Sequence, residues 1–125
     1  MHKIINSSNA PAPIGPYSQA TLAGNTLYVS GQIPLDSETG KLVSGTIEEE
    51  TDQVMLNIGA IVKGAGGDFS NIAKCSIFVK DMDDFGRINE TYGKYFEQNP
   101  PARETVEVSR LPKDVRVEIS CIAIL

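Results

Sequence analysis

Two side chains near the C-terminal end offer the clearest chemistry in this sequence. Arg103 carries a permanent positive charge, and its guanidinium group can bind a carboxylate or a phosphate through two parallel hydrogen bonds. Glu118 can orient a water molecule or move a proton if partial burial raises the pKa of its carboxyl group. Each also has a plainer explanation. Arg103 could form a surface ion pair with one of the 16 acidic residues, and Glu118 could lie on a solvated strand face.

Four further residues occupy positions where a ligand could be held. Tyr17 follows a stiff Gly-Pro turn, so it could stack on a planar ligand or form a hydrogen bond with it. Ser30 and Gly31 could offer a hydroxyl and backbone groups, and Asn89 could hold a polar group of the ligand. The alternatives that remain open are simple packing of Tyr17, a strand bulge at Gly31 and a structural hydrogen bond for Asn89.

The elements that must position Arg103 and Glu118 are two predicted strands. Apolar residues alternate with polar ones from Val106 onwards, the pattern breaks at 111–114, and the alternation resumes up to Ile119. We therefore expect a hairpin of two strands joined by a tight turn. Alternation by two predicts that one sheet face is apolar and covered. The other face carries Arg103 and Glu118, and it must meet water, a ligand or another subunit.

The rest of the chain predicts an α+β fold with two helices packed on one face of a mostly antiparallel sheet. A capping box at Thr46 and Glu49 begins the first helix, which a glycine-rich segment ends. The second helix begins at Asp81 or Asp83. The face of the sheet opposite the helices is predicted to be polar. This polarity implies that the face packs against copies of the same chain. The expected order is an edge strand at 3–6, a loop at 9–16, a hairpin of strands at 17–22 and 26–33, a helix from 46 to 64–67, a strand at 72–80, a helix up to about 97 and the closing hairpin.

Composition limits the functional classes. The 125 residues fit a single domain, 1–125, and a net charge of -5 gives little attraction to nucleic acid or anionic lipid. No apolar stretch is long enough for a membrane helix, and no signal peptide is expected. Cys75 and Cys121 fall on apolar strand faces, which favours buried free thiols in a reduced, cytoplasmic setting. Two separated cysteines and a lone His2 predict no metal site.

Several segments together resemble the Rid (YjgF-type) family of reactive-intermediate deaminases, in particular its RidA subfamily. The similarity extends over essentially the whole chain. It is carried by IGPYSQA (14–20), VSGQIP (29–34), INETY (88–92), PPAR (100–103) and VEVSRLPKDVRVEI (106–119).

This resemblance implies a chorismate-mutase-like fold assembled as a homotrimer, with clefts between subunits. It also implies cofactor-independent hydrolysis of 2-aminoacrylate and related enamines or imines to 2-keto acids and ammonia. In that scheme Arg103 holds the substrate carboxylate and Glu118 positions the attacking water. The residues that line the pocket are Tyr17, Ser30, Gly31, Asn89 and Thr105.

One position departs from the family pattern. Many RidA-type proteins have Ser-Cys after this arginine, whereas this chain has Glu104 and Thr105. The resemblance implies that the backbone at Thr105 still serves the site, and strand alternation turns Glu104 away from Arg103. Two other functions stay open, a trimeric binding module for small carboxylates and an RNA-directed activity. The acidic composition disfavours the RNA-directed activity.

Overall fold

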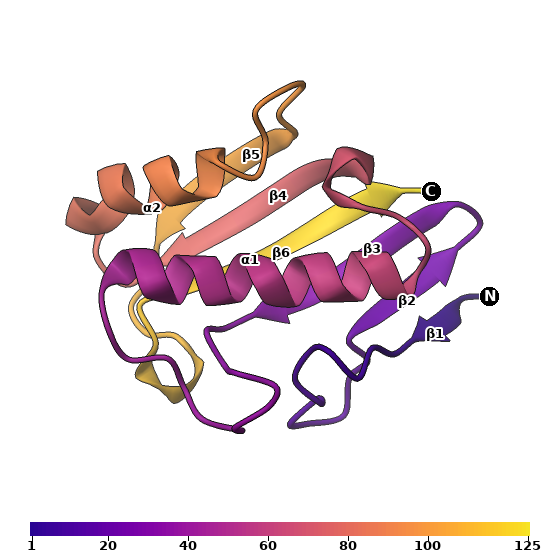
Figure 1. Cartoon of the computed structure of the whole chain (residues 1–125), viewed down its shortest axis with the longest axis horizontal. Helices are drawn as coiled ribbons and strands as arrows, with labels where there is room; N and C mark the ends of the chain where they lie inside the picture. Colours follow the sequence, from indigo (N-terminus) through magenta and orange to yellow (C-terminus); the bar gives the residue numbers. More distant parts are fainter.

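The computed structural model describes all residues from 1 to 125 and shows one mixed six-stranded sheet with two helices on one of its faces (Figure 1). The strand order is β1-β2-β3-β6-β4-β5. All neighbouring pairs are antiparallel except β4 and β5, which are parallel. The elements are β1 (Lys3–Ile5), β2 (Ala20–Ala23), β3 (Thr26–Gln32), α1 (Ile47–Gly64), β4 (Ile72–Val79), α2 (Phe85–Gly93), β5 (Ala102–Glu107) and β6 (Val117–Ile124), with short 3₁₀ turns at Phe69–Asn71, Met82–Asp84 and Pro112–Asp114.

Helix α1 begins where its sequence predicts. The Thr46 side chain accepts the backbone N–H of Glu49, and the Glu49 carboxylate accepts the backbone N–H of Thr46 in return. This capping box satisfies two N–H groups near the start of the helix, and three glutamates in the first turn suit the positive end of its dipole. Neither helix is both long enough and apolar enough to cross a membrane.

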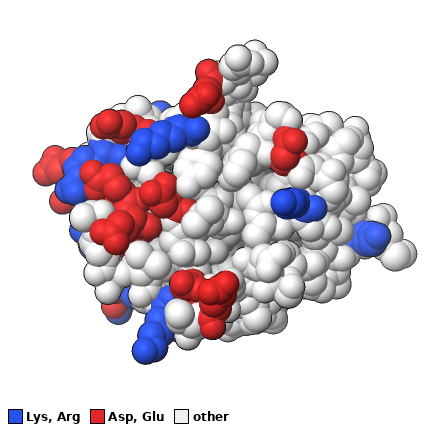
Figure 2. Space-filling model, in the orientation of Figure 1, with Lys and Arg blue, Asp and Glu red and all other residues white.

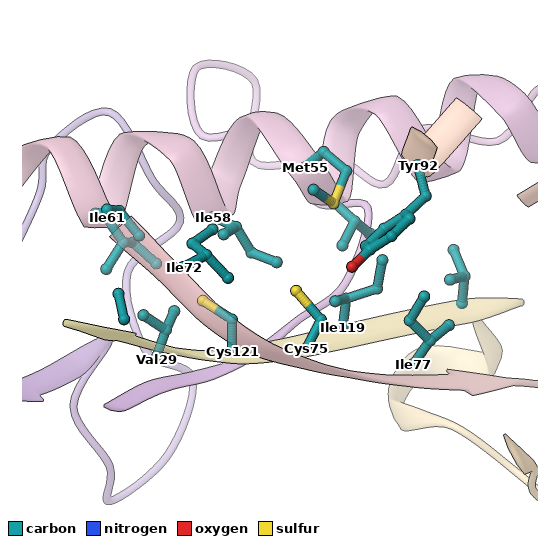
Figure 3. Packing of buried hydrophobic residues seen from close by; sticks show 14 of the residues in the cluster. Val29, Met55, Ile58, Ile61, Ile72, Cys75, Ile77, Tyr92, Ile119 and Cys121 are labelled. Carbon is teal, nitrogen blue, oxygen red and sulfur yellow. The ribbon is translucent and has the colours of Figure 1, made fainter. Parts of the chain in front are cut away.

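The core lies between α1 and the sheet (Figure 3). Met55, Ile58 and Ile61 project from α1 onto side chains of β3, β4 and β6, and Tyr92 of α2 points into the same layer beside Met55. The three α1 residues are fully buried, because helical spacing puts them on one stripe. The prediction of two helices on one sheet face is therefore confirmed.

Two segments are shorter than the sequence pattern predicts. Strand β2 begins at Ala20, because residues 17–19 belong to the preceding loop. In that loop the buried Gln19 amide donates to three backbone carbonyls, including that of Pro11 at 2.9 Å, so the loop packs on the body. Helix α2 ends at Gly93 and not near residue 97, and Asp81 caps the 3₁₀ turn that precedes it.

The predicted closing hairpin is wrong. Strand β4 lies between β5 and β6 and pairs with both, in parallel to β5 and antiparallel to β6. The segment between β5 and β6 therefore crosses a neighbouring strand instead of making a tight turn. Val106 is 42% exposed on the uncovered face of this edge strand, so the prediction of a covered apolar face in β5 is also wrong. Alternation shows which residues share a face, but it does not identify the partner strand.

An irregularity in β3 changes which of its side chains face the core. The register of β3 against β6 shifts between Val29 and Gln32, so the strand bulge, one of the alternatives left open for Gly31, is present. As a result Gln32, and not Ile33, pairs with the core residue Ile119 and is buried.

Candidate active site

Four of the residues singled out from the sequence line one hollow of about 440 Å³ on the uncovered face of the sheet. Tyr17, Ser30, Gly31 and Glu118 meet there, although Tyr17 belongs to the N-terminal loop, Ser30 and Gly31 to β3, and Glu118 to β6. Three apolar neighbours complete the lining, namely Ile14, Ile33 and Pro112. We call this group the Glu118 half-site.

Glu118 is the titratable group at the centre of this half-site. It is half-buried, and burial raises the pKa of its carboxyl group because the charged form loses hydration there. The carboxyl group makes no hydrogen bond or ion pair within the chain, so its acceptor positions are free for a water molecule or a ligand. A carboxylate with a raised pKa is suited to taking up and returning a proton.

The absence of a side chain at Gly31 leaves room for the Glu118 side chain over the backbone of β3. A Cβ atom added to Gly31 would overlap the Glu118 carboxyl group. On the same strand the Ser30 hydroxyl donates to the Ser18 carbonyl at 2.6 Å, which fixes the loop that carries Tyr17 against β3. The Tyr17 ring stays 48% exposed, and its hydroxyl accepts the Ile14 N–H at 3.4 Å.

The remaining candidates form a second group around Arg103. The Arg103 Nη1 donates to the Asn89 Oδ1 at 2.6 Å. Its guanidinium carbon lies 5.6 Å from the ring centre of Phe85 and 5.2 Å from that of Tyr92, within the range of cation–π attraction. The Nε and Nη2 groups of Arg103 make no hydrogen bond within the chain. The edge that would hold a carboxylate is therefore free, while the rest of the exposed side chain is held by α2. We call Arg103, Asn89, Phe85 and Tyr92 the Arg103 half-site.

Thr105 lies two residues along β5 from Arg103, and its side chain is on the same sheet face. Its hydroxyl oxygen is shielded from solvent and has no hydrogen-bond partner. The hydroxyl is therefore closed off from any ligand in this arrangement. Glu104 points to the opposite face, where it pairs with Lys74 at 3.1 Å and with the Ser76 hydroxyl. The expectation that its charge lies away from Arg103 is confirmed.

The two half-sites lie on opposite faces of the sheet. Arg103 is the register partner of the core residue Cys75, so it projects to the side covered by the helices. Glu118 is the register partner of Phe78, whose neighbours along β4 point into the core, so it projects to the uncovered side. The prediction that Arg103 and Glu118 share a face is therefore wrong within one chain, because it assumed that β5 and β6 pair directly.

Two residues of the Arg103 half-site were not identified as functional from the sequence. These residues are Phe85 and Tyr92. Their spacing from Asn89 contains the signal, because residues 85, 89 and 92 recur at the i, i+4 and i+7 positions of one helical face. The sequence did not show that Arg103 lies against this face.

Comparison with known proteins agrees with these features. A family model described as Endoribonuclease L-PSP matches residues 7–125. The chain belongs to this family.

Known relatives match this chain over almost its whole length. A RutC family protein of Pyrococcus horikoshii is 52% identical over 98% of this chain and 98% of its own length. A protein of Rattus norvegicus named 2-iminobutanoate/2-iminopropanoate deaminase is 48% identical over 99% of this chain and 90% of its own length. A Yersinia pestis structure of the conserved Rid protein family, described as being of unknown function, covers 100% of both chains with a TM-score of 0.97 and 44% identity. The resemblance to the Rid family is confirmed.

The family's description names a ribonuclease, so the charge distribution of this chain is relevant to whether it can bind RNA. Figure 2 shows that basic and acidic side chains are intermixed on the helix-bearing face, over the region where α1 begins and α2 lies. Binding to an RNA backbone calls for a continuous basic surface, and this face does not present one. The net charge of -5 also acts against polyanion binding.

Proposed function

We propose that this protein is a cofactor-independent deaminase that hydrolyses 2-aminoacrylate and related enamines or imines to 2-keto acids and ammonia. The observation that carries the proposal is the pair of complementary half-sites. One presents a free guanidinium edge for a carboxylate, and the other presents a half-buried carboxyl group of raised pKa beside an open hollow. The rat relative, named a deaminase of 2-iminobutanoate and 2-iminopropanoate, supports the same reaction class.

The reaction needs few groups from the protein besides Arg103 and Glu118. The enamine tautomerises to an imine, whose carbon is already electrophilic. Arg103 holds the carboxylate of the imino acid, and Glu118 takes a proton from water as the oxygen attacks this carbon. This proton passes to the nitrogen and gives an amino alcohol. The new hydroxyl group then gives up its proton, which also passes to the nitrogen, while the carbon–nitrogen bond breaks and the carbon–oxygen double bond forms. The products are a 2-keto acid and ammonia. Thus one water is consumed for each ammonia released.

We further propose that the active site forms between subunits of a homotrimer. Arg103 and Glu118 project from opposite faces of one sheet, so a small substrate can contact both only if they come from different chains. The uncovered sheet face supports such a contact, because Tyr28, Val106 and Ile124 remain 49%, 42% and 42% exposed there. An interface between two different surfaces of the same chain is heterologous, and it forms a closed ring when the rotation between subunits permits. Three subunits would give three identical sites.

The test of this function is release of ammonia from 2-aminoacrylate, generated by a pyridoxal-phosphate-dependent serine dehydratase, with and without the protein. Wild-type protein should accelerate the release, and Arg103→Ala should abolish the acceleration while remaining folded and trimeric. Unchanged activity of Arg103→Ala would contradict the role of this residue as the carboxylate clamp.

A mixing experiment tests whether the two half-sites come from different chains. Arg103→Ala and Glu118→Gln proteins, each of low activity, are unfolded together and refolded as mixed trimers. Random mixing in equal amounts gives intact sites in about one quarter of cases, so about one quarter of wild-type activity should return. Each variant refolded alone is the control. If the mixture stays as inactive as its components, both residues act within one chain and the shared site is excluded.

A binding module for small carboxylates is the second candidate, and the free edge of Arg103 favours it as much as it favours catalysis. Glu118 separates the two functions, because holding a carboxylate needs no acid that handles water. A trimer that binds 2-ketobutyrate but does not accelerate ammonia release would support the binding module.

A further inference from the structure

The two cysteines of the chain face one another across the centre of the sheet. Cys75 on β4 and Cys121 on β6 are register partners in an antiparallel pair. Both are free thiols, and both are buried on the side of the sheet that α1 covers (Figure 3). The proposed deamination uses neither thiol, although Cys75 is the register partner of Arg103.

The hydrogen-bond pattern shows what kind of pair they form. The Lys80 N–H donates to the Arg116 carbonyl at 3.0 Å, which makes residues 80 and 116 a hydrogen-bonded pair. Hydrogen-bonded and non-hydrogen-bonded pairs alternate along an antiparallel ladder, and this register has no shift between residues 74 and 79. Cys75 lies five residues before Lys80, so Cys75 and Cys121 form a non-hydrogen-bonded pair.

This type of pair suits a covalent link. The Cα atoms of a non-hydrogen-bonded pair are about 4.5 Å apart and the side chains are at their closest, and disulfides span Cα separations of about 4.4–6.8 Å. Since both side chains are on the same face, the two sulfur atoms can approach by rotation about the Cα–Cβ bonds, without moving either strand.

We propose that Cys75 and Cys121 form a disulfide site within the core, which closes when the chain folds in the presence of a small-molecule disulfide. One cysteine thiolate attacks the small disulfide, forms a mixed disulfide and releases one thiol. The second cysteine then attacks the mixed disulfide and releases the other thiol. The protein loses two protons and two electrons, which together make two hydrogen atoms, and the small disulfide gains them.

Burial determines when this reaction can occur. It raises the pKa of both thiols, so few thiolates are available in the folded protein, and reagents cannot reach them through α1. The link therefore forms before the core closes. Once formed, it joins β4 to β6, the two central strands, and stabilises the fold chiefly by restricting the unfolded chain.

The experiment starts from the full chain, reduced and unfolded. It is refolded in a mixture of reduced and oxidised glutathione, trapped with a maleimide in denaturant and weighed by mass spectrometry. The expected product is a monomeric chain that is lighter by two hydrogen atoms and carries no maleimide. Because the chain has only two cysteines, such a product can contain only the link between Cys75 and Cys121. Two maleimides on every chain, or disulfides only between chains, would overturn the proposal.

Thermal unfolding provides the second measurement. The oxidised protein should unfold at a temperature higher by on the order of 10 °C, and dithiothreitol should remove the difference. Cys121→Ala, which keeps Cys75, is the matched control and should show no shift between the two conditions. An oxidised form that unfolds at a lower temperature would overturn the fit of the disulfide to this pair. If the alanine variant does not fold, the mass measurement on the wild-type chain still decides.

Discussion

Gly31 and Glu118 share a space that only one side chain can fill. Gly31 lies on the bulge of β3, Glu118 lies on the adjacent strand β6, and a Cβ atom on Gly31 would overlap the Glu118 carboxyl group. Glycine at this position therefore allows the carboxyl group to rest over the backbone of β3, beside the hollow that Tyr17 lines. The position of the Glu118 carboxyl group, which we propose handles water, therefore depends on residue 31 being a glycine.

Gly31→Ala tests this relationship. The added methyl group should push the Glu118 carboxyl group away from β3 while the flexible side chain absorbs most of the strain. We expect a loss of roughly 10–100-fold in kcat for imine hydrolysis, because small displacements of a catalytic group are costly. The unfolding midpoint should change little. Steady-state kinetics and thermal unfolding of the same preparation measure both effects.

The control for this substitution is Gly93→Ala. A Cβ atom at Gly93 would meet no other atom within 4 Å, so this variant makes the same chemical change in open space. It should keep its activity. Wild-type activity in Gly31→Ala would show that the location of the Glu118 carboxyl group against β3 does not matter for turnover.

Thr105→Val tests whether the side chain at this position takes part in the reaction. The substitution replaces a buried hydroxyl without a partner by a methyl group of similar shape. Since an unsatisfied buried polar group costs about 1–3 kcal/mol, the variant should be more stable by about 1 kcal/mol. Turnover should stay within about 3-fold of wild type if only the backbone of Thr105 serves the site. Urea unfolding and kinetics are the measurements.

Thr51→Val is the matched control, because the Thr51 hydroxyl is also buried but donates to the Ile47 carbonyl at 2.8 Å. Loss of this bond should destabilise the protein by about 0.5–1.5 kcal/mol. A large loss of activity in Thr105→Val at unchanged stability would assign the hydroxyl itself to the substrate.

Glu118 should also leave a signature in the pH dependence of stability. Burial raises the pKa of its carboxyl group in the folded protein, so the folded state holds this proton more tightly than the unfolded chain does. As the pH rises from the ordinary glutamate pKa of about 4.3 through the raised value, wild type should lose stability that Glu118→Gln does not lose. At pH 7 the glutamine variant should therefore be the more stable protein, and the advantage should vanish below about pH 4.

Urea unfolding of both proteins at several pH values measures this difference. Glu90→Gln changes an exposed glutamate that makes no ion pair, and it should show no such pH-dependent gain. A Glu118→Gln protein that is less stable than wild type at pH 7 would mean that the carboxylate has a stabilising partner in the assembled protein.

Arg116 and Glu50 form an ion pair that ties α1 to the start of β6. The Arg116 Nε donates to the Glu50 carboxylate at 2.6 Å, and its Nη2 donates to the Gly45 carbonyl at 2.7 Å. The Glu50 side chain is only 6% exposed. Arg116→Met should therefore destabilise the protein by about 2–4 kcal/mol, because it leaves a buried carboxylate without its partner. Adding Glu50→Gln to this variant should restore part of the loss.

The comparison is with Arg110→Met, which removes an exposed ion pair with Asp114. That pair lies in solvent, so its loss should cost no more than about 0.5 kcal/mol in urea unfolding. Equal losses for the two arginine variants would show that burial of Glu50 contributes nothing to the energy of its pair.

Some features of the candidate site follow from local sequence. The turn before Tyr17 and the bulge at Gly31 are encoded by glycine and proline, which act on the few residues beside them. The position of Asn89 on the same face of α2 as Phe85 and Tyr92 follows from helical periodicity. The pairing of Arg103 with α2 does not, because residues 89 and 103 are far enough apart in sequence that only the packed fold brings them within 2.6 Å.

Sequence alone was sufficient for the identity and order of the main elements, the capping box of α1, the position of both helices on one sheet face and the family. These depend on neighbouring residues or on motifs that can be read along the chain. The packed fold was needed to show that β4 lies between β5 and β6, and hence that Arg103 and Glu118 project from opposite faces. The physical reason is that a strand's alternation is the same whichever neighbour it pairs with. The choice of neighbour depends on how all six strands and both helices close one core.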